Sequence, residues 1–211
     1  MTIPHRLFAL VPLCLLLLPQ RGYGAEVAAG RWTVVAGRVA VTKIGADAPR
    51  LAAVGDTIAV GDLLETGADA RAQALLADQT VVNLSSGTSL RLLQYSWDAA
   101  NNRRTAVVKL LAGKARFIVP AHKDSRFNVE SAQAALATGA GDFVALAAPQ
   151  ETVVAVLEGS VRVKNVSTFL VEKVDVRANQ TSAVKDKTAP SYPSALPPAE
   201  RKAYRRDAQR F

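Results

Sequence analysis

The sequence predicts an all-β protein made of two related halves of short strands, β-solenoid-like or sandwich-like, with a short basic C-terminal tail. Three observations carry this prediction. Apolar and polar side chains alternate in short runs that turn residues separate. The same motifs recur in the same order in both halves of the chain. Prolines and basic residues gather after residue 189.

The composition is typical of a folded domain and excludes several classes of function. The chain has 211 residues, of which 49% are hydrophobic and 21% charged, and its net charge is +8. A disordered chain would contain fewer apolar residues. The chain has one cysteine, Cys14, and two histidines. A disulfide framework is therefore excluded, and few residues are available for thiol or histidine chemistry.

Residues 1–25 have the pattern of a secretory signal peptide. The run Leu7–Leu18 carries no charge, and it is followed by Pro19 and by small residues up to Ala25. This run is shorter than the roughly 20 apolar residues that a membrane-spanning helix needs. We therefore expect export across the inner membrane, cleavage after Gly24 or Ala25, and a periplasmic location, with an extracellular one as the alternative.

Residues 26–189 are expected to form one domain of short strands. The segment Asp98–Asn102 is typical of a turn between two of them. Two alanine-rich segments, 74–77 and 133–137, are too short and too closely flanked by strand patterns to be helices. The two-residue alternation of half-buried strands is clearest in Val39–Thr42, Ser89–Leu92, Arg126–Val129, Ser160–Val163 and Glu172–Val176.

An internal repeat divides this domain into halves of about 31–104 and 105–184. The stretch that begins at Thr66 has a counterpart that begins at Thr138, 72 residues later. At the same offset, Val81-Val82 corresponds to Val153-Val154, and we expect the two pairs to occupy equivalent strands. The glycines at 37, 113 and 159 each precede a strand, which favours tight turns with positive φ.

Residues 190–211 are expected to form a proline-rich basic tail that is separable from the domain, with a short helix after Pro198. One interpretation is a solvated chain terminus. The other is a basic arm that makes weak contact with an anionic surface, such as lipid headgroups or a wall polymer. Tyr204 and Phe211 give this arm a small apolar component.

The residue inventory argues against an enzyme, and it indicates no cofactor and no metal. After loss of the leader, His122 is the only histidine, and it is expected to be an exposed turn residue. A glycosidase needs two carboxylates in one cleft. Nothing in the sequence brings any two of the candidate carboxylates together; these are Glu65, Glu130, Glu151 and Glu158.

A hairpin end is the candidate binding site. Tyr95, Trp97, Arg103 and Arg104 flank the expected turn, and tyrosine, tryptophan and arginine are favoured at binding hot spots. The alternative is that the aromatic side chains pack onto their own hairpin. Trp32 is expected to be an anchor of the core.

The order of motifs from Arg31 to Val184 resembles the FecR-type periplasmic domain. The best matches are Gly61–Gly67, Leu110–Val119 and Glu158–Val163, and Phe143 is kept where the family has Gly-Thr-x-Phe. The resemblance identifies these structural positions: Gly37, Gly61, Gly67, Gly113, Gly139, Phe143 and Gly159.

The best-known members of that family carry signals from an outer-membrane receptor to a sigma factor through an anti-sigma segment and a transmembrane helix. Only six residues precede the apolar run here, so the resemblance implies a freestanding exported module without either part. We expect a non-catalytic interaction module of the bacterial envelope that binds a protein or an anionic polymer and takes part in signalling. Nucleic acid is not an expected partner. The alternative is a carbohydrate-active or peptidoglycan-directed envelope protein.

Overall fold

The computed structural model of the chain describes residues 28–167 and 169–209, and its side chains up to residue 206. The signal-peptide prediction therefore lies outside the described residues. Within them the fold is all-β with one helix, α1 (Pro198–Gln209), which confirms the predicted fold class. Of the two architectures expected, the sandwich is the one formed, because the strands make two hydrogen-bonded sheets that enclose a common core.

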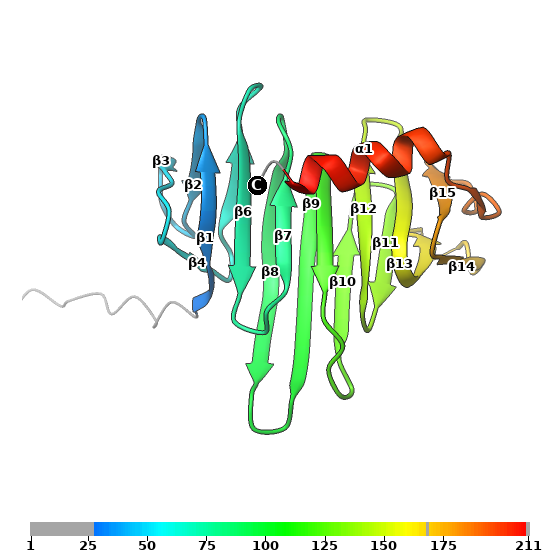
Figure 1. Cartoon of the computed structure of the whole chain (residues 1–211), viewed down its shortest axis with the longest axis horizontal. Coiled ribbons are helices and arrows are strands. Elements are labelled where there is room, and N and C mark those ends of the chain that lie inside the picture. The colour runs from blue at the N-terminus through cyan, green and yellow to red at the C-terminus, as the bar shows by residue number, and fades with distance from the viewer. Residues whose placement is uncertain (1–27, 168, 210–211) are drawn as a thin grey trace, which may run out of the picture.

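Sheet A forms the face that α1 crosses (Figure 1). Its neighbours pair antiparallel throughout. From one edge to the other it contains β4 (Thr57–Ala59), β1 (Ala28–Ala36), β6 (Arg71–Leu76), β7 (Val81–Leu84), the second part of β9 (Arg103–Val119), β12 (Gly141–Ala147), the first part of β13 (Glu151–Asn165), β15 (Gln180–Lys185) and β16 (Ser194–Ala195).

Sheet B forms the opposite layer. Its neighbours are antiparallel except β9 and β10, which pair parallel. In order it contains β3 (Arg50–Leu51), β2 (Val39–Thr42), β5 (Leu63–Thr66), β8 (Ser89–Asp98), the first part of β9, β10 (Arg126–Glu130), β11 (Ala134–Thr138), the second part of β13 and β14 (Lys173–Arg177).

Two long strands, β9 and β13, belong to both sheets and pass from one to the other at a glycine. Gly113 and Gly159 have φ values of 85° and 78°, so the expected positive φ is confirmed. The expected tight turns are wrong at these two positions, because each glycine is a bend inside one continuous strand. A Cβ on Gly113 would lie 2.5 Å from the Gly87 carbonyl oxygen, so the close approach of the chains also requires glycine there.

The core lies between the sheets and is built from the inward positions of the alternating strands. Trp32 is 1% exposed, as expected of a core anchor. Phe117 of β9 stacks on Phe143 of β12 with ring centroids 5.2 Å apart, and it lies 5.6 Å from Phe127 of sheet B. Since these rings come from both sheets, each buried ring contributes about 1.5–3 kcal/mol to holding the layers together.

The pairing pattern confirms the repeat. In sheet A, β6 pairs with β7 as β12 pairs with β13, and Val81-Val82 and Val153-Val154 lie in these corresponding strands. In sheet B, β5 pairs with β8 as β11 pairs with the second part of β13. One side-chain bond also repeats, because Thr66 Oγ1 donates to the Thr88 carbonyl and Thr138 Oγ1 to the Ser160 carbonyl.

The remaining motif glycines occupy strand ends. Gly37 and Gly61 have positive φ values of 78° and 93°. Gly67 follows β5 and Gly139 follows β11, which places them at the same point of the repeat. These two glycines do not have positive φ, so the turn geometry there does not itself demand glycine.

The C-terminal segment packs on sheet A. Strand β16 pairs with β15, and the expected helix after Pro198 forms as α1. Leu196 and Tyr204 contact an apolar cluster of sheet A that contains Val144 and Leu157. This packing differs from the expectation of a tail separable from the domain, because the tail supplies apolar side chains to a cluster. Phe211 lies outside the described residues. No helix in the described part of the chain is long and apolar enough to cross a membrane.

Candidate functional site

The outer face of sheet B is strongly basic. Successive side chains of a strand point to opposite faces, and the outward positions of β8, β9, β10, β13 and β14 carry exposed cations. Acidic side chains on the same outward positions are fewer; they are Glu65, Asp98, Glu130 and Asp175. The exposed cations of this surface, which we call the basic face, are Arg91, Arg103, Lys109, Arg126, Arg162, Lys164, Lys173 and Arg177.

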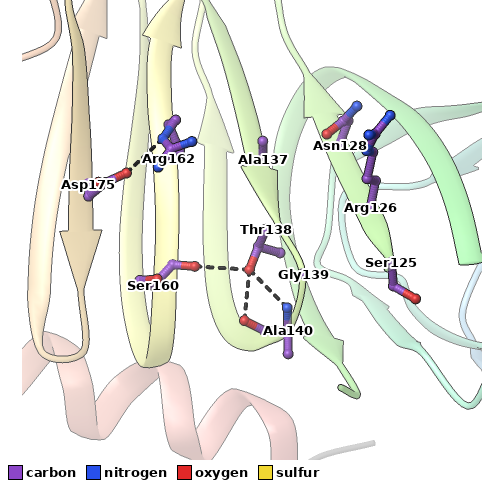
Figure 2. Close-up of a pocket in the computed structure, with 10 residues that line it drawn as sticks. All are labelled: Ser125, Arg126, Asn128, Ala137, Thr138, Gly139, Ala140, Ser160, Arg162 and Asp175. Carbon is purple, nitrogen blue, oxygen red and sulfur yellow. Dashed lines mark hydrogen bonds and ion pairs between the residues drawn. The ribbon is translucent and has the colours of Figure 1, made fainter. Parts of the chain in front are cut away.

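A groove of about 430 Å³ runs over β11 within the basic face. Its floor is made of the small residues Ala137, Thr138 and Gly139. Taller side chains stand on both sides: Arg126 and Asn128 on β10, and Arg162 on β13, as Figure 2 shows. The complete lining is Ser125, Arg126, Asn128, Ala137, Thr138, Gly139, Ala140, Ser160, Arg162 and Asp175.

One end of the groove is fixed by Thr138. Its Oγ1 lies 2.7 Å from the Ala140 carbonyl oxygen and 2.9 Å from that of Ser160, and it accepts a hydrogen bond from Ala140 N at 3.2 Å. These bonds hold the bend after β11 against β13 (Figure 2). The floor is therefore rigid, while the side walls carry long side chains.

The two arginines of the walls differ in their partners. Arg162 Nε donates to Asp175 Oδ1 at 2.9 Å, and both side chains are about half exposed. The side chain of Arg126 makes no hydrogen bond or ion pair with another described residue. One cation of the groove is thus available to a ligand as it stands, and the other is paired with an exposed carboxylate.

The four residues predicted to form a binding site at the hairpin end differ in their exposure to solvent. Tyr95 and Arg104 are 6% and 1% exposed, so their side chains face the core. Trp97 is half-buried and its ring lies 4.5 Å from that of His122. Only Arg103 is exposed, and it lies at the hairpin end of the basic face. His122, expected to be exposed, is half-buried, and its Nε2 lies 2.9 Å from the Asp78 carbonyl oxygen.

Tyr95 and Arg104 belong to a buried polar cluster around Asp78. Arg104 Nη1 donates to Asp78 Oδ2 at 2.8 Å, and the Tyr95 hydroxyl donates to Asp78 Oδ1 at 3.0 Å. Burial opposes ionisation of Asp78, but hydrogen bonds from Thr80 and Arg104 outweigh it and lower the pKa of its carboxyl group. Burial, together with the Asp78 charge, raises the pKa of the Tyr95 hydroxyl. The cluster is a structural ion pair rather than a surface site.

Sequence reasoning did not single out Arg126 and Arg162. The strands that carry them were predicted. In the sequence Arg126 is next to Phe127 and Arg162 is next to Val161, so each arginine takes the outward position beside a buried apolar residue. The alternation of each strand therefore already indicated that these two arginines point outward. That they flank one groove follows only from the pairing of β11 with β10 on one side and β13 on the other. Within the described residues, no three His, Cys, Asp or Glu side chains gather in a way that could hold a metal ion.

The fold and the basic face together define a two-sheet β-domain with a cationic surface on one layer. Residues 62–162 match the family described as FecR protein, and this match confirms the resemblance seen in the sequence. This region includes every lining residue of the groove except Asp175. No curated protein matches the chain.

Two crystal structures of a candidate anti-sigma factor from Parabacteroides distasonis ATCC 8503 are similar to the chain. The first has 20% identity and a TM-score of 0.53, and the match covers 67% of this chain and 63% of that one. The second has 22% identity and a TM-score of 0.50, and covers 63% and 60%. The chain thus spans less than two thirds of either structure. At this identity the likeness shows the fold alone.

Proposed function

We propose that the protein is an exported, non-catalytic FecR-like module of the bacterial envelope that binds an acidic partner and contributes to signalling. The observation that carries the proposal is the basic face, where exposed arginines and lysines line an open groove. Such a surface attracts anionic partners and raises their rate of encounter. The FecR match and the anti-sigma name of the similar structures support the link with signalling.

The carbohydrate-active alternative has less support from the groove. A glycosidase needs a second carboxylate across the scissile bond, at about 5–10 Å from the first. Among the lining residues the only carboxylate is that of Asp175, and it is paired with Arg162. The groove therefore has the charges of a binding site for anions and lacks the pair of acids that hydrolysis requires.

Site-directed crosslinking in the envelope tests the proposal. A photoreactive amino acid replaces Asn128 in the groove in one strain and Arg205 on the exposed side of α1 in a second strain. We expect a discrete adduct from position 128, absent from position 205, that is lost when Arg91 and Lys109 are both changed to glutamate. Equal adducts from both positions, or release of soluble fragments from purified peptidoglycan by the protein, would contradict it.

A further inference from the structure

The groove over β11 has the width of one extended chain. Neighbouring strands lie about 4.8 Å apart, so β10 and β13, on either side of β11, place their side chains roughly 10 Å apart. An α-helix with its side chains has a diameter of about 10–12 Å and would not reach the floor between these walls. An extended peptide could lie along Ala137, Thr138 and Gly139 without a steric conflict with the floor.

The polar groups of the groove are suited to carboxylates. One row of paired residues runs across the groove from Asn128 through Ala137 to Arg162 and Asp175. A guanidinium group binds a carboxylate through two parallel hydrogen bonds, and Arg126 and Arg162 offer one such group from each wall. The lining includes no aromatic ring on whose face a sugar could pack. The chemistry therefore favours an acidic peptide over a glycan.

In the free protein, the Asp175 carboxylate forms an ion pair with Arg162. The contact joins Arg162 Nε and Asp175 Oδ1 at 2.9 Å, with side chains 56% and 52% exposed. Exposed ion pairs contribute little net stability because water and salt screen them. A carboxylate of a partner can therefore exchange with that of Asp175 at small cost.

We infer that the groove binds an extended acidic segment of a partner protein along β11, with Arg126 and Arg162 as the carboxylate-binding residues. Asp175 acts as an internal competitor that occupies Arg162 in the free protein. This inference rests on the proposed function, because it takes the basic face as the binding surface and names its partner.

Fluorescence anisotropy with synthetic probes tests the inference. The probe is a labelled eight-residue peptide of alternating glutamate and threonine, and its control has glutamine in place of glutamate. The protein is the mature chain from residue 26. We expect the acidic probe to bind, the glutamine probe not to bind, and binding to weaken with salt as the Debye length falls from about 10 Å at 0.1 M to about 3 Å at 1 M.

Two substitutions with opposite expected effects separate the groove from general charge attraction. Arg126→Glu should weaken binding by about tenfold or more, because it removes a charge-assisted contact and adds repulsion. Asp175→Asn should tighten binding by about two- to fivefold, because it frees Arg162. The matched controls are Arg205→Glu on α1 and Asp186→Asn in the exposed loop after β15, which change the net charge equally but lie off the groove.

Each outcome decides the inference. Weaker binding with Arg126→Glu and tighter binding with Asp175→Asn, with neither control effective, supports it. Equal effects of the groove variants and their controls overturn it, as does failure of the acidic probe to bind. Binding of an anionic polysaccharide such as polygalacturonate more tightly than the peptide also overturns it. If the envelope adduct at Asn128 forms while the acidic probe fails, the proposed function stands and only the peptide assignment falls.

Discussion

The buried cluster around Asp78 explains why an arginine is tolerated inside a small β-sandwich. Arg104 is 1% exposed and Asp78 is fully buried, and isolated charges in such surroundings would be very costly. Besides Asp78, Arg104 has backbone acceptors: its Nη2 donates to the Gly139 carbonyl at 2.9 Å. Gly139 also forms part of the groove floor. The buried arginine thus connects the hairpin end of β9 to the floor of the proposed binding groove.

Removal of the Asp78 carboxylate should destabilise the whole domain. Asp78→Asn leaves the Arg104 guanidinium buried without its counter-charge, and breaking a buried pair in this way typically costs about 3–5 kcal/mol. We expect a loss of that size in the free energy of unfolding, measured with urea. Tyr95→Phe removes one neutral donor to the same carboxylate and should cost only about 1 kcal/mol. An equal, small effect of both substitutions would show that the ion pair is not essential.

The Asp78 carboxyl group should also make the stability of the domain sensitive to acid. Its pKa is lowered in the folded protein from the ordinary 3.8. The stabilisation is therefore complete above that ordinary value and is lost as the pH falls through the lower folded value. We expect the free energy of unfolding of the wild type to fall more steeply between pH 5 and pH 2 than that of Asp78→Asn. Parallel pH profiles would contradict this.

At the scale of elements, the glycine bends allow β9 and β13 to serve both sheets. Gly113 and Gly87 both have positive φ, 85° and 62°, but only Gly113 is crowded. Replacement by alanine should therefore cost about 1 kcal/mol at Gly87, where a Cβ meets no atom within 4 Å, and clearly more at Gly113. Thermal unfolding of the two variants measures the difference. Similar melting temperatures would show that β9 can shift to relieve the contact.

The C-terminal helix should stabilise the domain through Tyr204. The Tyr204 side chain packs on the cluster with Leu157, and the backbone carbonyl oxygen of the same residue accepts a hydrogen bond from Arg116 Nη1 at 3.1 Å. We expect deletion of residues 190–211 to lower the melting temperature, and Tyr204→Ala to reproduce part of that loss. Arg205→Ala, on the exposed side of α1, is the control. An unchanged melting temperature after the deletion would restore the view of the tail as a separable arm.

The elements were largely predictable because each strand carries its own alternation. Val39–Thr42 coincides with β2, and the alanine-rich segment 133–137, rejected as a helix, contributes to β11. What the alternation does not encode is which side chains meet across the sheets. Arg104 therefore appeared to be a surface residue until Asp78, 26 residues away, was placed beside it. The packing of the tail on sheet A was not predicted for a similar reason, since its apolar contacts are few and join residues far apart in sequence.

At the scale of the whole molecule, the two outer faces of the sandwich have different surroundings. Helix α1 covers part of the outer face of sheet A (Figure 1), where Tyr204 packs on the cluster that contains Val144 and Leu157. The outer face of sheet B keeps its cations and its groove open to solvent. Both halves of the repeat contribute strands to both sheets. The two outer faces therefore differ because of their outward-facing side chains and because the tail packs on one of them.

An exported chain would present the basic face to envelope partners, and export is the prediction on which that role depends. The uncharged run Leu7–Leu18 and the small residues before Glu26 predict cleavage after Gly24 or Ala25. N-terminal mass spectrometry of the protein from the periplasmic fraction should therefore find a chain that begins at Ala25 or Glu26. Leu15→Arg interrupts the apolar run and should leave the chain uncleaved in the cytoplasm. A wild-type protein that still begins near Met1 would contradict export by a cleaved leader.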